Sequence, residues 1–190
     1  MNSARLSIDA TFFAELMGEL ARRGQGRRES GAFLLTDRAH PADTLPQPVT
    51  AVAFYDDLDP ACLTGGITFH ATGYTALYAR CRREGLRVSG DVHTHPYQRV
   101  GQSPTDANHP MVALDGHVAL IAPRYAAGVT SAAELGVHVR HRGSWTSLYG
   151  PRAAEVVQIR DDRPAKTRAP AWRQLLAHLT MPQRRHRRNR

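Results

Sequence analysis

Apolar residues recur along the chain in spacings typical of two helices. Residues 9–24 carry four apolar side chains at i, i+3, i+4 and i+7, which predicts an amphipathic helix capped by Asp9 and stopped at Gly24. A second helix is predicted across 70–84, because a helical apolar spacing there ends at Gly85. The stripe that this second helix is expected to bury consists of Tyr74, Leu77, Tyr78 and Cys81.

Shorter apolar or alternating runs predict strands. These runs lie at 4–8, 29–35, 49–55, 86–95, 117–122, 135–140, 145–149 and 156–159, and residues 37–48 between two of them are loop by composition. The order of helix, strands, helix and then mostly strands predicts one α/β (α+β) domain, in which helices pack on a β-sheet. We expect this domain to span residues 1–160.

Residues 161–190 differ in composition from the rest of the chain, and we expect a linker, a short amphipathic helix and an Arg-rich tail there. The helix is predicted at 171–180, either closing over the core or docking on a partner or a membrane surface. The last seven residues, RRHRRNR, contain five Arg and no acidic residue, and therefore hold +5 of the formal net charge of +8. Such a tail supports non-specific contact with phosphates. Because no groove-reading motif or aromatic stacking platform accompanies it, we expect no specific nucleic-acid partner.

Composition favours a soluble cytoplasmic protein. No apolar run approaches the roughly 20 residues that a membrane-spanning helix needs. The first residues, MNSARLSIDATFF, lack the pattern of a secretory signal. Two cysteines, Cys62 and Cys81, are too few for a disulfide framework.

A candidate metal site lies where a predicted strand ends, in GDVHTHP at 90–96. His93 and His95 are two residues apart, and strand side chains alternate between faces, so both imidazoles project from the same side. Asp106, eleven residues beyond His95, is the candidate third ligand. Two His and one carboxylate leave a fourth tetrahedral position open, which is typical of a catalytic zinc site.

Each half of this pattern also has a purely structural interpretation. A lone pair of histidines is common on protein surfaces. Ser103-Pro104-Thr105-Asp106 has the signature of a helix start, with Ser as N-cap, Pro at N1 and an acidic residue at N3. The two interpretations of Asp106 are compatible, since a helix start can fix the backbone from which its carboxylate reaches a metal.

The joint pattern of H-x-H-P and S-x-x-D, with seven residues between the second His and the Ser, resembles the signature of the JAMM (MPN-plus) zinc metallopeptidases. The order of predicted elements over about residues 5–150 also resembles that family, and Glu29 in ESGAFLL occupies the place of its upstream Glu. The resemblance implies an MPN-type domain with a central mixed, curved β-sheet flanked by helices. It further implies zinc (Zn2+) bound by His93, His95 and Asp106, Glu29 as general acid and base, and Ser103 as the residue that stabilises the oxyanion.

The stretch QSPTDANHPMVALDGHVALIAP resembles small bacterial members of the family that accompany ubiquitin-like conjugation systems, including systems of antiphage defence. That resemblance implies a deubiquitinase-like isopeptidase or peptidase. Its substrate would be the C-terminus of a ubiquitin-like protein, in conjugates or in a precursor, and its partners would include the activating and conjugating enzymes of the same operon. The same chemistry on a sulfur-carrier adduct or a phage tail peptide, and a non-catalytic MPN-type scaffold, stay open.

Other titratable residues have simpler interpretations. His109 is expected to be a loop residue or to support the site, and Asp91 lies on the ligand face of its strand, where a supporting role is open. The cysteines have no basic partner at a useful spacing, which disfavours a cysteine nucleophile. Four further histidines are interpreted as structural, the last two on a surface-like strand: His70, His117, His138 and His141.

Overall fold

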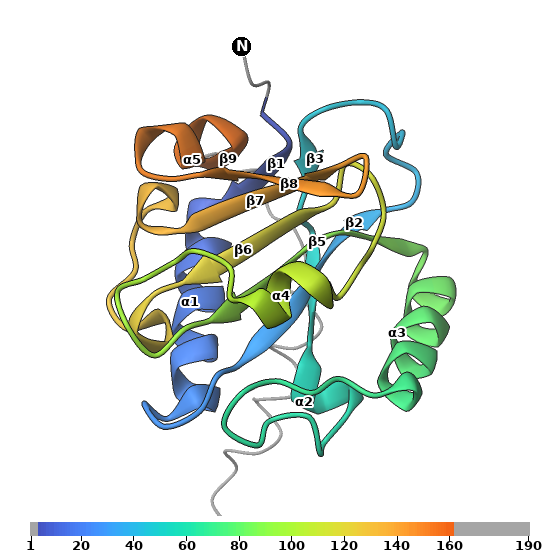
Figure 1. Cartoon of the computed structure of the whole chain (residues 1–190). Helices are drawn as coiled ribbons and strands as arrows, with labels where there is room; N and C mark the ends of the chain where they lie inside the picture. Colours follow the sequence, from blue (N-terminus) through green and yellow to red (C-terminus); the bar gives the residue numbers. More distant parts are fainter. Residues whose placement is uncertain (1–3, 162–190) are drawn as a thin grey trace, which may run out of the picture.

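The structure, a computed structural model, describes residues 4–161 (Figure 1). The helix expected at 171–180 and the Arg-rich tail lie outside the described residues. Two single turns of 3-10 helix lie at Arg124–Ala126 and Ala132–Glu134. The main elements are, in chain order, β1 (Leu6–Asp9), α1 (Ala10–Gly24), β2 (Gly31–Asp37), β3 (Gln47–Pro48), β4 (Ala51–Phe54), α2 (Tyr55–Leu58), α3 (Ala71–Glu84), β5 (Leu86–Thr94), α4 (Pro104–Asn108), β6 (Val118–Ala122), β7 (Gly136–His141), β8 (Ser144–Leu148), α5 (Pro151–Val156) and β9 (Val157–Arg160).

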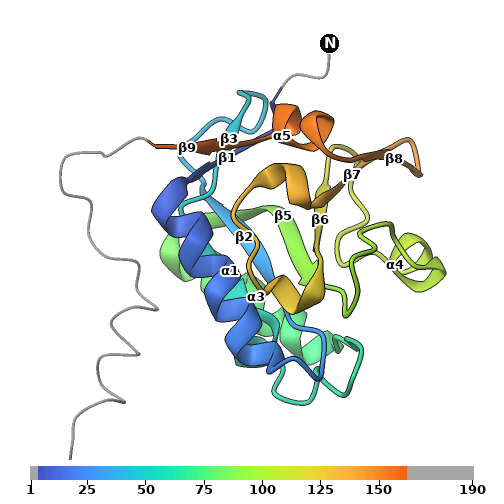
Figure 2. The same ribbon diagram turned by 90° about the vertical axis from the view of Figure 1, so that its left-hand side faces the viewer.

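A six-stranded sheet in the order β4-β2-β5-β6-β7-β8 forms the centre of the domain. Only β5 and β6 pair in parallel, and the other neighbours are antiparallel. A small parallel sheet, β3-β1-β9, lies beside it. Helices α1 and α3 flank the large sheet on opposite sides (Figures 1 and 2). The predicted α/β class with a mixed sheet flanked by helices is confirmed.

Helix α1 forms where the apolar spacing predicts it. Asp9 caps it, because its Oδ1 accepts a hydrogen bond from the Phe12 amide at 3.0 Å. The helix ends at Gly24, and the next residue, Gln25, takes a left-handed conformation with φ of 54°. The apolar stripe is buried against the sheet, in one core with side chains of β1, β2, β5, β6 and β7: Phe13, Leu16, Met17 and Leu20.

Helix α3 covers the other face, where Leu77 and Cys81 join a second core with Phe33 and Tyr55. Tyr78, which the spacing places in the buried stripe, is 51% exposed. Tyr78 lies about 100° around the helix from Leu77, and it does not join the core that buries Leu77 and Cys81. That part of the predicted stripe is therefore wrong.

The remaining differences from the predicted elements are local. The strand predicted at 29–35 begins only at Gly31, which leaves Glu29 in the turn before it. The strand predicted at 156–159 is β9, and helix α5 directly before it was not predicted. This helix has six residues and buries only Ala153 and Val156, which is too few positions to show a helical period.

None of the helices formed by residues 4–161 combines the length and the apolar character needed to cross a membrane.

Candidate metal centre

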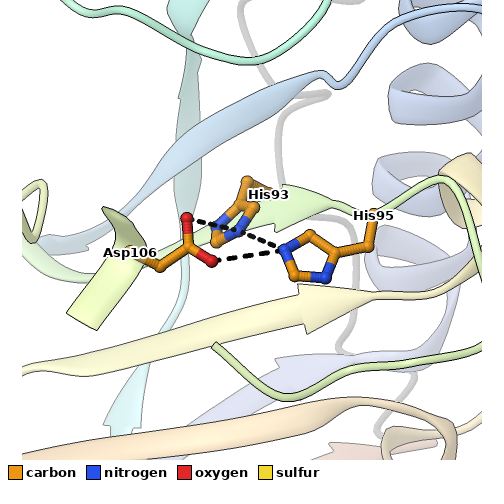
Figure 3. A group of neighbouring side chains, drawn as sticks. All are labelled: His93, His95 and Asp106. Carbon is orange, nitrogen blue, oxygen red and sulfur yellow. Dashed lines mark hydrogen bonds and ion pairs between the residues drawn. The ribbon is translucent and has the colours of Figure 1, made fainter. Parts of the chain in front are cut away.

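Strand β5 presents two imidazoles on one face of the sheet. His93 pairs with Gly31 of β2 and with Ile121 of β6 at the middle of the sheet. The ladder continues past the end of β5, because the His95 amide donates to the Ala122 carbonyl at 2.8 Å. Residues two apart on such a strand share a face, and Figure 3 shows both rings directed toward Asp106.

Helix α4 brings Asp106 to the two histidines. Ser103 caps the helix: its Oγ accepts from the Asp106 amide at 3.2 Å, while the Ser103 amide donates to Asp106 Oδ2 at 2.7 Å. This reciprocal pair is the predicted capping box. The structural interpretation of Ser103 and Asp106 is confirmed, and the same contacts orient the Asp106 carboxylate toward the imidazoles.

The spacing of the three donor groups fits a tetrahedral metal. His93 Nε2 lies 3.2 Å from His95 Nε2, and 3.6 Å from Asp106 Oδ1. His95 Nε2 lies 3.4 Å from Asp106 Oδ2. Tetrahedral zinc with bonds of about 2.05 Å has neighbouring ligand atoms about 3.3 Å apart, so all three separations match edges of such a tetrahedron. Within residues 4–161, these three residues are the group of His, Cys, Asp and Glu side chains spaced to hold a metal.

The hydrogen bonding of His95 leaves Nε2 as the ring nitrogen that can bind a metal. Its Nδ1 lies 3.2 Å from the Arg99 carbonyl oxygen. Because a carbonyl oxygen only accepts, Nδ1 carries the proton and Nε2 presents its lone pair to the site. Metal-binding histidines usually have their second nitrogen held in this way.

In the metal-free site, the Asp106 carboxylate and the His95 imidazole stabilise each other's charged forms. Burial raises the pKa of Asp106, but hydrogen bonds from His93 and His95 outweigh it and hold that pKa well below its usual range. Burial lowers the pKa of His95, but the hydrogen bond and the charge of Asp106 outweigh it, so the pKa of His95 is raised overall. An ionised carboxylate beside two imidazoles is a site where a divalent cation can replace protons.

Glu29 lies in the same cleft but does not belong to the group of His93, His95 and Asp106 that could hold a metal. Its backbone amide donates to the Gly65 carbonyl at 2.9 Å, and a Cβ placed on Gly66 would lie 3.9 Å from Glu29 Oε2. Burial raises the pKa of Glu29, while His93 and His95 oppose the rise. The Glu29 carboxyl therefore binds a proton more readily than an exposed Glu does.

The cleft has a volume of about 790 Å³ and contains all five residues singled out from the sequence, namely Glu29, His93, His95, Ser103 and Asp106. One of its walls is apolar and aromatic: Ile67, Phe69, Tyr74 and Met111. The candidate metal group therefore lies in a cleft that also presents apolar surface.

On β5, two residues before His93, Asp91 lines the same cleft and joins a buried network. Its Oδ1 lies 2.5 Å from His117 Nε2, and its Oδ2 accepts from the Tyr55 hydroxyl at 3.2 Å. Burial and the neighbouring Asp91 raise the pKa of Tyr55 well above its usual value. The sequence left a supporting role of Asp91 open, but it gave no indication that Tyr55, on a different element, reaches the same carboxylate.

Two other histidines differ in their surroundings. His138, predicted on a surface-like strand, is fully buried, because residues 96–103 pass over β7 and the Val100 carbonyl lies 3.0 Å from its Nε2. That part of the prediction is wrong. His109 is exposed and caps the C-terminal end of α4. It lines the cleft but does not belong to the ligand group.

The cysteines are buried and poorly suited to nucleophilic chemistry. Burial raises the pKa of Cys62 to about 12, and burial also raises the pKa of Cys81. A buried thiol with a raised pKa carries little of the thiolate that attacks a substrate. The structure agrees with the expectation that neither cysteine is a nucleophile, and it buries Cys81 in the core as the stripe of α3 predicts.

Comparison with solved structures shows a shared fold at low sequence identity, and no family model matches the chain. The solution structure of protein DSY2949 from Desulfitobacterium hafniense is 16% identical and covers 83% of this chain and 94% of its own, with a TM-score of 0.56. The solution structure of a protein from Salinibacter ruber is 16% identical and covers 85% and 96%, with a TM-score of 0.52. AF2198, a JAB1/MPN domain protein from Archaeoglobus fulgidus, is 14% identical and covers 78% and 98%, but its TM-score of 0.38 is too low to establish a common fold.

Proposed function

We propose that the protein is a JAMM-type zinc metallopeptidase. The observation that carries this proposal is the tetrahedral spacing of His93, His95 and Asp106 in one cleft with Glu29. The sequence signature described above supports the same assignment. Two histidines and one carboxylate are a common ligand set of catalytic zinc, which keeps a further coordination position for reaction.

The chain supplies the groups that peptide hydrolysis needs around such an ion. Held by His93, His95 and Asp106, zinc would supply Lewis acidity and a hydroxide nucleophile near neutral pH. Glu29, with its raised pKa, takes a proton from the attacking water and delivers it to the leaving amine. Ser103 Oγ accepts from the Asp106 amide, so its own hydrogen remains to be donated to the oxyanion that develops in the cleft.

For the substrate, we propose the C-terminal tail of a ubiquitin-like protein, cleaved from conjugates or from a precursor. The resemblance of residues 102–123 to bacterial family members associated with ubiquitin-like conjugation supports this choice. The cleft that holds the three residues, and a smaller hollow that adjoins it at His95, also suit an extended tail. The activating and conjugating enzymes of such a system are the proposed partners, in the cytoplasm, and no specific nucleic acid is among them.

The test uses the full chain loaded with zinc and a ubiquitin-like protein encoded by a neighbouring gene, fused at its C-terminus to a reporter. We expect cleavage directly after the modifier's last residue. The control variant Glu29→Gln removes the proton-transfer group and lowers the rate by roughly 10²–10⁴-fold. A zinc-loaded protein that cleaves a sulfur-carrier adduct or a phage tail peptide instead would refute the modifier as substrate. A protein that binds no zinc would indicate a non-catalytic scaffold.

A further inference from the structure

The segment between β5 and β6 carries Ser103 and Asp106 but has little regular structure of its own. Helix α4 is its one α-helix and has five residues. A helix this short does not hold its position by its own hydrogen bonds. The place of the Asp106 carboxylate must therefore be set by contacts with other elements.

The first such contact is made by β7, below the loop that precedes α4. His138 lies 2.9 Å from Ser147 Oγ through Nδ1 and 3.0 Å from the Val100 carbonyl oxygen through Nε2. Because the carbonyl only accepts, Nε2 carries the proton and the Ser147 hydroxyl donates to Nδ1. Gly136 permits this approach, since a Cβ there would lie 1.9 Å from the Val100 oxygen. The loop therefore packs directly against β7 at the Val100 carbonyl group.

The second contact is made by β8 with the helix itself. Trp145 donates from Nε1 to the Ala107 carbonyl at 3.1 Å, one residue beyond Asp106. A cation–π contact within the same hairpin holds the Trp145 ring, because the Arg140 guanidinium lies 5.3 Å from the ring centroid. Trp145 also lines the cleft, so the same side chain borders the space that substrate would enter.

We infer that the β7–β8 hairpin is a positioning device for the metal centre, acting through His138 and Trp145. His138 sets the backbone on the N-terminal side of Ser103, and Trp145 sets it on the C-terminal side of Asp106. Together they bracket the capping box and fix the third ligand against the two histidines of β5. Neither residue touches the metal ligands directly, and both are positioning residues. The inference rests on the proposed metal site.

The test measures zinc affinity with a competing chelator in four variants of the full chain. His138→Leu and Trp145→Phe each remove one hydrogen-bond donor to the segment between β5 and β6, and each keeps a large apolar side chain at the same position. We expect zinc to bind roughly 10–100-fold more weakly in each variant. This is the range typical when a protein loses contacts that orient a metal-binding side chain. His138→Gln keeps a nitrogen donor at the position of Nε2 and should restore affinity. Thr146→Ala is the control, because Thr146 is exposed and projects from the opposite face of β8.

A second measurement separates positioning from stability. Hydrogen–deuterium exchange of the metal-free protein should be faster across 97–108 in His138→Leu and Trp145→Phe, and unchanged in Thr146→Ala. Variants that lose global stability yet keep wild-type zinc affinity would overturn the inference. If the wild-type chain binds no zinc, the proposed function fails, and unchanged exchange across 97–108 would then overturn the positioning role as well.

Discussion

Replacement of Asp91 by Ala tests the buried network that this residue of β5 forms with His117 and Tyr55. The carboxylate accepts from His117 at 2.5 Å and from Tyr55 at 3.2 Å, and all three side chains are buried. Asp91→Ala leaves two buried donors without an acceptor, at about 1–3 kcal/mol each. The variant no longer buries a carboxylate, which offsets part of this cost. We therefore expect the free energy of unfolding to fall by about 3–4 kcal/mol. Tyr55→Phe removes one donor and leaves the carboxylate paired with His117, and should cost only about 1 kcal/mol.

Urea unfolding of the metal-free protein, followed by circular dichroism, measures both losses. With a slope of about 2 kcal/mol per molar urea, Asp91→Ala should lower the midpoint by about 1.5–2 M, and Tyr55→Phe by about 0.5 M. Equal small shifts for the two variants would refute the reasoning, because they would show that His117 does not depend on Asp91 for its partner.

Three further predictions concern the site and its support. Glu29→Gln should retain zinc at the wild-type stoichiometry while losing peptidase activity; loss of the metal would instead make Glu29 a ligand. Zinc affinity should rise with pH through and beyond 6.5, because the pKa of His95 is raised and its proton competes with the metal; a chelator titration that shows no pH dependence between about 6 and 8 would contradict this. Gly31→Ala should lower the free energy of unfolding in urea by about 1–3 kcal/mol. Its Cβ would lie 2.3 Å from a ring carbon of Tyr55 and 2.8 Å from the Val92 oxygen. An unchanged free energy of unfolding would contradict that close approach.

Features that depend on neighbours in the chain were predictable from the sequence. The apolar stripe and Asp9 cap of α1 are local patterns, and so is the capping box of Ser103 and Asp106. The shared face of His93 and His95 follows from the alternation of a strand alone. These features are confirmed because each needs only backbone geometry over a few residues.

Features that depend on long-range packing were not predictable. His138 has an ordinary strand context, and it is buried only because a loop almost forty residues earlier crosses it. Trp145 reads as a strand residue, and nothing near it in the sequence indicates its bond to Ala107. Only a family resemblance indicates Glu29 in the sequence, and its neighbours Gly65 and Gly66 belong to a separate loop that the sequence does not link to it.

The most direct test of the metal centre is the zinc content of purified protein, with His109→Ala as the matched control. His109 lies three residues from Asp106 and lines the same cleft, but it does not belong to the ligand group. We predict close to one zinc per chain in the wild type and in His109→Ala, and almost none in Asp106→Ala after dialysis against a weak chelator. Full zinc content in Asp106→Ala, or loss of zinc in His109→Ala, would contradict the assignment of His93, His95 and Asp106 as the ligands.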